Sequence, residues 1–364
     1  MWNKNDVTKK LGITYPIIQA GMAGGTTTPE LIAAVSNAGG LGTLGAGYMK
    51  AEDMREAIKR IKALTDQPFG VNLFIPETAE VSTDKIRKAN ELLRPYREEL
   101  QIAEPDVKQV SSENFDKQVE VLIEEEITVC SFTFGVPSKE NVRRLKEENI
   151  IVMGTATTVK EAIINEGYGV DMVVMQGSEA GGHRGTFSGS FGDSMIGTMS
   201  LIPQAVDHVQ IPVIAAGGIM DGRGVLAALT LGAQAVQMGT AFVTAVESGA
   251  KTQHIDAILT STEDQTVITS VFSGKPARGI QNDFIREIKP YEEDLPDYPI
   301  MNTLTAGIRS EAAKQNRPQW IHLWSGQSPR LSARRNAAAL LSRIVLQVET
   351  IIRDRRLEGN DDDT

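Results

Sequence analysis

The sequence has a single cysteine, Cys130, among its 364 residues. One thiol excludes an internal disulfide and any metal site built from several thiolates. Cys130 lies in the apolar run TVCSFTF, which indicates a buried strand, and a free cysteine in that setting usually serves as a small hydrophobic side chain. Histidine is also scarce, with four in the chain. We therefore expect neither a disulfide nor a bound metal.

Basic residues and long hydrophobic runs are also in short supply. Lys and Arg number 37 against 47 Asp and Glu, which gives a formal net charge of −10. This balance argues against a nucleic-acid surface, which needs a basic patch to neutralise phosphates. No run approaches the roughly 18 apolar residues of a membrane helix, and the start, MWNKNDVTKKLG, lacks the apolar centre of a signal peptide. We expect a cytoplasmic protein that binds neither nucleic acid nor membrane.

What the sequence does contain is a regular alternation of short β-rich runs with longer amphipathic segments. The eight expected strands cover residues 15–21, 41–47, 69–75, 128–134, 150–156, 172–177, 211–218 and 235–242. A helix candidate follows nearly every strand, and the first begins at Thr28 as cap with Pro29 in its first turn. Strands that are apolar on both faces and separated by helices indicate a parallel sheet covered by helices.

Eight such units favour a closed (β/α)8 TIM barrel over an open doubly wound sheet. The open sheet would need a GxGxxG pattern after its first strand, and GMAGGTTTPE has no convincing one. We expect a single domain over residues 1–355. A helical insertion is expected near 76–112, a segment over the barrel mouth near 250–335, and an acidic tail at 356–364.

Glycine and amide side chains dominate the carboxyl ends of the expected strands, where a (β/α)8 enzyme places its active site. These ends offer no paired carboxylates, no metal-ligand cluster and no GxSxG signature. Gly217 and Gly218 in AAGGIMDGRG, with Gly239 and Thr240 in QMGTAF, would instead suit the phosphate of a cofactor. The same glycines would also serve simply as tight turns of the barrel.

Two amide side chains, Asn72 and Gln176, interrupt strands that are otherwise apolar. A buried amide needs hydrogen-bond partners, since leaving it unpaired costs about 1–3 kcal/mol. The polar edge of a flavin ring would offer both donors and acceptors. Pairing with a neighbouring strand is the alternative.

One histidine, His183, lies in the glycine-rich stretch QGSEAGGHRG directly after an expected strand. Glycines let the backbone approach a ligand closely, so an imidazole there would face an open space. We expect His183 to be catalytic. Its neighbour Glu179 would either orient the ring or anchor the loop.

The remaining candidates for active-site charge carry weaker signals. Arg184 is expected to be a surface charge, and His208 and His254 are expected to be solvated. His322, in WIHLWSGQ, would pack at the barrel mouth.

Taken together, these stretches resemble the successive motifs of the nitronate monooxygenases, a family formerly called 2-nitropropane dioxygenases. The resemblance runs from about residue 10 to about residue 335. The motifs that carry it are YPIIQAGMAG, GVNLF, SFTFGVPS, GTATTVKEA, QGSEAGGHRGTF, IPVIAAGGIMDGRG, VQMGTAF and WSGQSPRL. One departure is Gly21, where members often have proline.

The resemblance implies a (β/α)8 barrel that binds FMN non-covalently at its mouth. His183 matches the family's active-site histidine, and Met22 in AGM would lie near the flavin ring. The FMN contacts carried over by motif fall on Asn72, Gln176, Gly181, Gly218, Gln237, Met238, Gly239 and Thr240.

The implied reaction is the oxidation of alkyl nitronates, such as propionate 3-nitronate, by O2 to a carbonyl compound and nitrite. His183 would hold the nitronate oxygens by hydrogen bonding and charge, and it would act as a base toward a neutral nitroalkane. The implied partners are a small nitronate and O2, with the chain a monomer or weak homo-oligomer. A flavin-dependent enoyl-ACP reductase, an NAD(P)H:quinone reductase and a flavin-binding storage or sensor protein are the alternatives.

Overall fold

The computed structural model describes residues 1–77, 82–107 and 113–361, and the side chains as far as residue 355. Eight parallel strands form a barrel in the order β1-β9-β8-β6-β5-β4-β3-β2. The first and last strands of this order meet at a parallel bridge between Ile18 and Leu41, where Gln19 N donates to Leu41 O at 2.9 Å. The expected (β/α)8 barrel is confirmed. Its strands are β1 (Ile17–Gln19), β2 (Gly42–Gly45), β3 (Phe69–Phe74), β4 (Val129–Thr133), β5 (Ile151–Ala156), β6 (Met172–Gln176), β8 (Val213–Ala216) and β9 (Ala235–Met238).

Each barrel strand falls inside the run expected for it, but the last is shorter than expected. Residues 240–242 were expected to continue the strand and instead begin the short helix α10 (Thr240–Val243). Pairing with β1 ends at Met238, and Phe242 N then donates to Gly239 O at 2.8 Å, which closes a helical turn. The backbone around Gly239 therefore turns at the barrel mouth.

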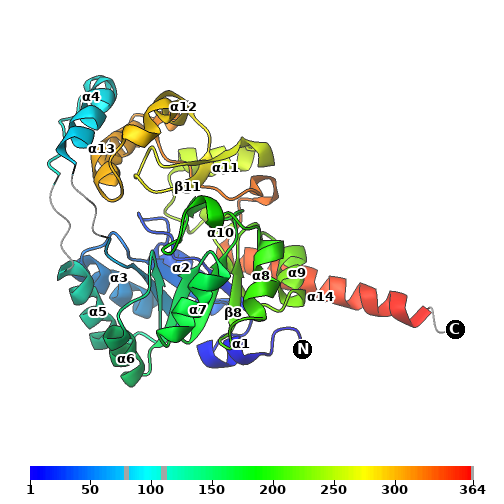
Figure 1. Ribbon diagram of the computed structural model, residues 1–364. Helices are drawn as coiled ribbons and strands as arrows, with labels where there is room; N and C mark the ends of the chain where they lie inside the picture. The colour runs from blue at the N-terminus through cyan, green and yellow to red at the C-terminus, as the bar shows by residue number, and fades with distance from the viewer. Residues whose placement is uncertain (78–81, 108–112, 362–364) are drawn as a thin grey trace.

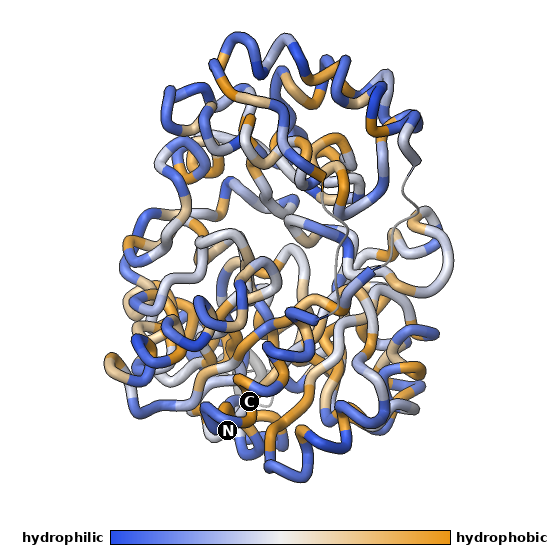
Figure 2. The backbone as a smooth tube through the Cα atoms, turned by 90° about the vertical axis from the view of Figure 1, so that its left-hand side faces the viewer, coloured by the Kyte–Doolittle hydropathy of each residue, from blue (hydrophilic) through white to orange (hydrophobic). Residues whose placement is uncertain are grey.

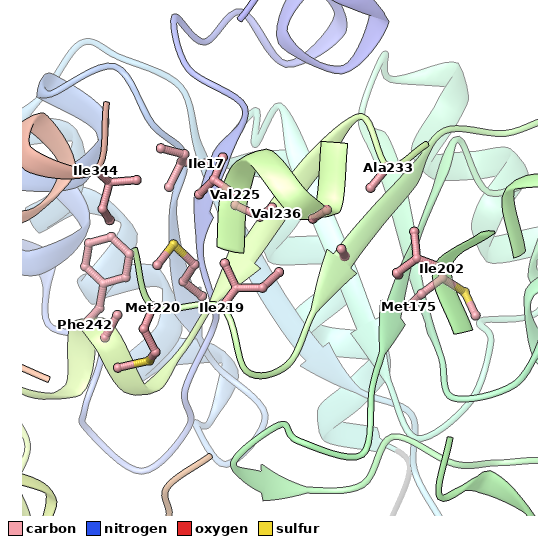
Figure 3. Close-up of a cluster of buried hydrophobic side chains, with 14 of the residues drawn as sticks. Ile17, Met175, Ile202, Ile219, Met220, Val225, Ala233, Val236, Phe242 and Ile344 are labelled. Carbon is pink, nitrogen blue, oxygen red and sulfur yellow. The ribbon is translucent and has the colours of Figure 1, made fainter. Parts of the chain in front are cut away.

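Helices cover the outside of the barrel, and their starts follow ordinary capping chemistry. Thr28 caps α2 by accepting from Leu31 N at 3.0 Å, with Pro29 in the first turn, as expected. Ile17 of β1 and Val236 of β9 belong to the same buried cluster as Val225 of α9 and Ile344 of α14 (Figure 3). The outer helices are α2 (Pro29–Asn37), α3 (Ala51–Leu64), α5 (Glu113–Glu124), α6 (Lys139–Glu147), α7 (Val159–Gly167), α8 (Thr198–Val206), α9 (Gly222–Thr230) and α14 (Ala337–Asp361).

The amino end of the barrel is closed by α1 (Asp6–Leu11), which lies at the bottom in Figure 1. Its Val7 and Leu11 pack against interior side chains of the strands, among them Ile18 and Met153. Cys130 of β4 is fully buried, and burial raises the pKa of its thiol well above the ordinary value, so it is the inert hydrophobic side chain expected. The interior of the barrel is packed rather than hollow, because the cluster of Val7, Leu11, Ile18 and Met153 fills it.

A second layer, here called the cap, consists of residues 82–107 and 250–328 and covers the carboxyl ends of the strands (Figure 1). It has its own hydrophobic core, in which Leu93 of the 76–112 insertion packs with Phe272, Phe284 and Leu304. Figure 2 shows hydrophobic segments in both the barrel and the cap. The helices and strands of the cap are α4 (Thr83–Leu100), α11 (Thr252–Thr260), α12 (Asp283–Ile288), α13 (Ile300–Lys314), β10 (Thr266–Thr269) and β11 (Ala277–Ile280).

A three-stranded antiparallel sheet joins the cap to the barrel, in the order β10-β11-β7. The strand β7 (Gly182–His183) belongs to the loop after β6, and His183 pairs with Ala277 of the cap. Sequence periodicity did not predict this pairing, because β7 has two residues. The loop that carries His183 is thus part of a sheet and is held by backbone hydrogen bonds.

Short connections and the chain ends complete the fold. Of the 76–112 insertion, residues 78–81 and 108–112 lie outside the described residues, as do residues 362–364 of the acidic tail. No helix among the described residues is long and apolar enough to cross a membrane. The 3₁₀ turns are η1 (Gly192–Ser194), η2 (Glu263–Gln265), η3 (Lys289–Asp294), η4 (Pro318–Trp320) and η5 (Pro329–Leu331). The organisation of the chain as a single domain stays a prediction.

Candidate active site

A cavity of about 640 Å³ lies between the carboxyl ends of the barrel strands and the cap. Its volume is in the range of pockets that enclose small molecules and cofactors. Residues far apart in the sequence meet in its wall, and among them are nine of the expected site residues: Met22, Asn72, Gln176, Gly181, His183, Gly218, Gln237, Gly239 and Thr240.

Met238 is the expected FMN contact that does not line this cavity. Its side chain is 1% exposed and packs in the core between the strands and the outer helices. The alternation of side chains along β9 explains this placement, because neighbouring residues of a strand point to opposite faces. Gln237 faces the cavity, so Met238 faces away from it.

The ends of β8 and β9 form one side of the cavity. Gly217 and Gly218 have φ angles of +117° and +71°, a conformation that side chains rarely adopt. A Cβ atom at Gly239 would lie 3.8 Å from its nearest neighbours, so the wall there has open space. Thr240 Oγ1 accepts from Gly326 N at 2.9 Å, which leaves the hydroxyl proton of Thr240 for a ligand.

Gly181 has a packing requirement of its own. A Cβ atom there would overlap the backbone of Gly326, so the loop after β6 and the WSGQ segment approach too closely for a larger residue. The same holds at Gly21, where a Cβ atom would lie 2.6 Å from Cβ of Asn72. The glycine at residue 21 therefore permits the first turn to pack closely against Asn72.

The two amides within strands are both hydrogen-bonded inside the protein. Asn72 Nδ2 donates to Ser131 Oγ at 2.9 Å and to Thr133 Oγ1 at 3.1 Å, which is the pairing with a neighbouring strand considered above. Asn72 Oδ1 accepts no hydrogen bond from the described part of the chain, so it remains an acceptor for a ligand.

Gln176 fixes the loop that carries His183, residues 177–185, here called the histidine loop. Its Nε2 donates to His183 O at 3.0 Å, and its Oε1 accepts from Gly185 N at 2.8 Å. The amide therefore holds the backbone on both sides of Arg184. Gln237, in contrast, makes no side-chain hydrogen bond with the described residues and presents a free amide to the cavity.

His183 stands between the barrel loop and aromatic residues. Its ring lies edge-on to Phe134 and Trp324, with centroids 5.9 and 5.4 Å away. Burial, together with the positive charges of Arg309 and Lys275, lowers the pKa of His183 to about 3. The ring is thus neutral at pH 7 in the free protein, and the role of His183 toward a substrate stays a prediction.

The neutral ring is oriented by a serine of the cap. His183 Nε2 lies 2.8 Å from Ser273 Oγ, and Ser273 Oγ in turn lies 3.1 Å from Lys275 O. When the hydroxyl donates to that carbonyl, it accepts from Nε2–H, and Nδ1 of His183 carries a lone pair. When the hydroxyl turns to Nε2, Nδ1 carries the proton instead. Nδ1 has no hydrogen bond to the described residues, so either form is free to meet a ligand.

Arg184, expected at the surface, is 1% exposed. Its guanidinium donates to Gly177 O at 2.6 Å, Gln176 O at 3.0 Å and Ser194 O at 2.9 Å. Burial lowers its pKa to about 10, so it remains a cation at neutral pH. Arg184 therefore cross-links the histidine loop from within the protein, a role that its charge and loop position did not reveal.

Two further charged residues hold the loop, and one of them is Glu179. Its carboxylate accepts from Thr198 N at 2.9 Å and from Thr198 Oγ1 at 2.8 Å, so it anchors the loop and does not orient His183. From the cap, Arg278 donates to Ser178 O through Nε at 3.0 Å and Nη2 at 2.9 Å. The loop is therefore prearranged by charged hydrogen bonds at both ends.

The cap contributes residues that the sequence interpretation missed or placed elsewhere. His254, expected in solvent, is 9% exposed, and its Nε2 lies 2.8 Å from Trp324 O. His322 does lie at the mouth, as expected, with Nδ1 3.1 Å from Nη1 of Arg309. Burial lowers the pKa of both histidines. His208 is exposed, as expected.

The charges around the cavity have one sign. Lys251 and Arg309 line it together with His183, His254 and His322. All of the lining residues fall within the described ranges, and none of them is Asp or Glu. The described residues also contain no group of three or more His, Cys, Asp or Glu side chains that could hold a metal ion. The wall is thus suited to an anionic ligand.

Comparisons with known proteins agree with this geometry. The chain is 52% identical over 354 residues to a probable nitronate monooxygenase of Staphylococcus haemolyticus, which covers 97% of this chain and 99% of that protein. Among solved structures, the nitroalkane oxidase from Streptomyces ansochromogenes is 38% identical, with a TM-score of 0.89 and coverage of 95% and 98%. FabK from Thermotoga maritima is 32% identical, with a TM-score of 0.77 and coverage of 97% and 98%.

A family model described as nitronate monooxygenase matches residues 4–347, which include the whole barrel and the cap. The chain therefore belongs to the nitronate monooxygenase family.

Proposed function

We propose that this protein is an FMN-dependent nitronate monooxygenase that oxidises alkyl nitronates, such as propionate 3-nitronate, with O2 to a carbonyl compound and nitrite. The observation that carries the proposal is a cavity lined by no acidic residue, in which the neutral His183 shares the wall with glycines and free polar groups. Detoxification in the cytoplasm by a monomer or weak homo-oligomer is the role that we propose for this activity.

The residues present fit FMN. Gly239 leaves open space in the wall, the Thr240 hydroxyl keeps its proton for a phosphate oxygen, and Gly218 supplies a backbone that a side chain would obstruct. Asn72 Oδ1 and the Gln237 amide would meet the polar edge of the flavin, and Gln176 supports the loop beside it. Bound FMN would accept an electron from the nitronate, which is the redox chemistry that the side chains lack.

Chemistry at the substrate would fall to His183. With its proton on Nδ1, the neutral ring donates a hydrogen bond to a nitronate oxygen. With its proton on Nε2, toward Ser273, the ring would present the Nδ1 lone pair to the α-proton of a neutral nitroalkane, but a pKa of about 3 makes it a weak base, so the nitronate is the substrate that we expect. Phe134, Trp324 and Tyr298 around the ring exclude water, which strengthens both interactions.

The experiment that tests the proposal has two parts. The flavin released by denaturation is identified by chromatography, and FAD as the main species would contradict the cofactor assignment. Purified protein is then mixed with propionate 3-nitronate in an oxygen electrode, and O2 consumption with nitrite formation is expected.

The reductase alternatives are tested in the same preparation. We expect a nitronate to change the flavin absorbance under anaerobic conditions and NADH or NADPH to change it slowly or not at all. Rapid bleaching by a nicotinamide with no response to a nitronate would place the protein among the reductases.

A further inference from the structure

Arg309 of α13 is a cation in the cavity wall with uncharged partners. Nη2 donates to Asn302 O and Oδ1, both at 2.8 Å, Nη1 donates to His322 at 3.1 Å, and Nε donates to Thr305 O at 3.3 Å. In the described part of the chain, no carboxylate lies within ion-pair distance of Arg309. Arg184 is 1% exposed and does not line the cavity, whereas Arg309 is partly exposed and lines it.

The charge of Arg309 survives its burial. Burial lowers its pKa to about 10, which leaves the guanidinium protonated at neutral pH. A buried charge without a counter-ion is costly, and the cost is offset when an anion binds beside it. The arrangement is therefore one that a bound anion completes.

His322 adds a second donor beside this charge. A guanidinium only donates, so the hydrogen bond from Arg309 makes Nδ1 of His322 an acceptor. Burial and the charge of Arg309 hold the pKa of His322 well below its ordinary value, so the neutral ring carries its proton on Nε2. Arg309 thus fixes the tautomer of His322 and leaves an N–H group free at a residue that lines the cavity.

The position of Arg309 connects it with the substrate side of the cavity. Trp324 lies between the histidines, with ring centroids 5.4 Å from both His322 and His183. Two positive charges lower the pKa of His183, and the effect of Arg309 is larger than that of Lys275. The phosphate-binding candidates, Gly239 and Thr240, come from the barrel, whereas Arg309 and His322 come from the cap.

We propose that Arg309 and His322 form a carboxylate-binding subsite for the far end of the substrate. The proposal rests on the proposed function and assigns the residues that would recognise the carboxylate of a nitronate such as propionate 3-nitronate. The nitronate end would lie at His183 and the carboxylate at Arg309. The one free N–H on Nη1 of Arg309 and the Nε2–H of His322 would each donate to the carboxylate, which would orient the substrate as well as bind it.

The test compares propionate 3-nitronate with propyl-1-nitronate, which has the same number of carbons and no carboxylate. In Arg309→Met we expect KM for propionate 3-nitronate to rise roughly 10–100-fold, the loss typical of a charged hydrogen-bonded pair. KM for propyl-1-nitronate should change less than about 3-fold. Arg309→Lys keeps the charge and should recover part of the loss. Arg286→Met removes an exposed cation of the cap, paired with Asp283, and serves as the control for net charge.

A binding measurement separates this inference from the proposed function. Succinate, an unreactive dicarboxylate, is titrated calorimetrically into the FMN-loaded protein, and we expect its affinity to fall in Arg309→Met and to persist in Arg286→Met. If neither nitronate is turned over but succinate binding still depends on Arg309, the proposed function fails and the subsite stands. Equal losses for both nitronates, unchanged succinate binding, or release of FMN from a folded Arg309→Met would each overturn the subsite.

Discussion

His183 of the barrel loop and Ser273 of the cap meet at 2.8 Å through Nε2 and Oγ. The two residues are 90 positions apart in the sequence, and the antiparallel pairing of β7 with β11 brings them together. Ser273 is 1% exposed and also contacts the carbonyl of Lys275, so its hydroxyl sits at a fixed point and pairs with either tautomer of the ring. The cap therefore supplies the hydrogen-bond partner that orients the barrel's histidine.

Replacing Ser273 by Ala should lower kcat for nitronates roughly 10–100-fold while FMN remains bound, because the ring loses the partner that fixes its orientation and tautomer. Steady-state kinetics with the flavin absorbance as reference would measure this. Ser261→Ala removes another buried serine of the cap, one that donates to a backbone carbonyl of α11, and should leave kcat unchanged. Equal losses in both variants would indicate a general weakening of the cap.

His183→Ala should keep the flavin spectrum and lose most turnover. Loss of one polar contact made chiefly in the transition state typically costs roughly 10²–10³ in rate. The FMN contacts assigned above use other residues, so the absorbance spectrum and the kinetics can be read independently. A colourless His183→Ala protein would show instead that the histidine holds the cofactor.

Acid should destabilise the fold through the neutral histidine. The pKa of His183 is about 3 in the folded chain against an ordinary value of 6.5, so the unfolded chain binds the proton first as the pH falls. Stability is therefore lost progressively between pH 6.5 and about 3. Urea unfolding of the wild type and His183→Gln over this interval should show a shallower pH dependence in the variant. The same dependence in both proteins would contradict the lowered pKa.

Gly239→Asp should weaken FMN binding by at least about 10-fold relative to Gly239→Asn. Both side chains have the same shape, and the open space at Gly239 accommodates a Cβ atom, so the carboxylate charge is the difference between them. Reconstitution of apoprotein followed by flavin fluorescence would give both dissociation constants. Similar values for Asp and Asn would place the phosphate away from Gly239.

Arg184→Met should lower the free energy of unfolding by about 3 kcal/mol, because the carbonyl groups of Gln176, Gly177 and Ser194 lose their charged donor. The matched variant Arg143→Met removes an exposed arginine that pairs with Glu140 and Glu147, and it should cost less than about 0.5 kcal/mol. Denaturant unfolding monitored by circular dichroism would measure both. A cost at Arg184 no greater than at Arg143 would rule out the cross-linking role.

The parts of this protein that follow from local sequence were predictable. Strand periodicity located all eight barrel strands, and capping residues such as Thr28 and Pro29 located a helix start. His183 and the glycines around it were found because their neighbours in the sequence are unusual for buried strands and helices.

Arg309 shows why the rest of the site was not predictable. Within its helix it looks like any exposed arginine, and only the docking of α13 over the barrel mouth makes it a cation of the cavity wall. Arg184 and His254 were misplaced for the same reason, since their burial depends on segments far away in the chain. The end of β9 was overestimated because Thr240 and Phe242 have high strand propensity, and the tertiary turn at Gly239 overrides it.

The strand pairing between β7 and β11 also limits how molecules reach His183. A hinged lid opens by swinging away from its barrel, but here such a swing would pull Arg184 N from Pro276 O, a hydrogen bond of 2.9 Å, and break the pairing of His183 with Ala277. The cap could then not swing open without breaking the backbone contacts that hold His183 in place. Substrate and product should therefore enter and leave through gaps that open when side chains rotate. Such rotations take place in about nanoseconds, so wide opening of the cap should not limit the rate of turnover.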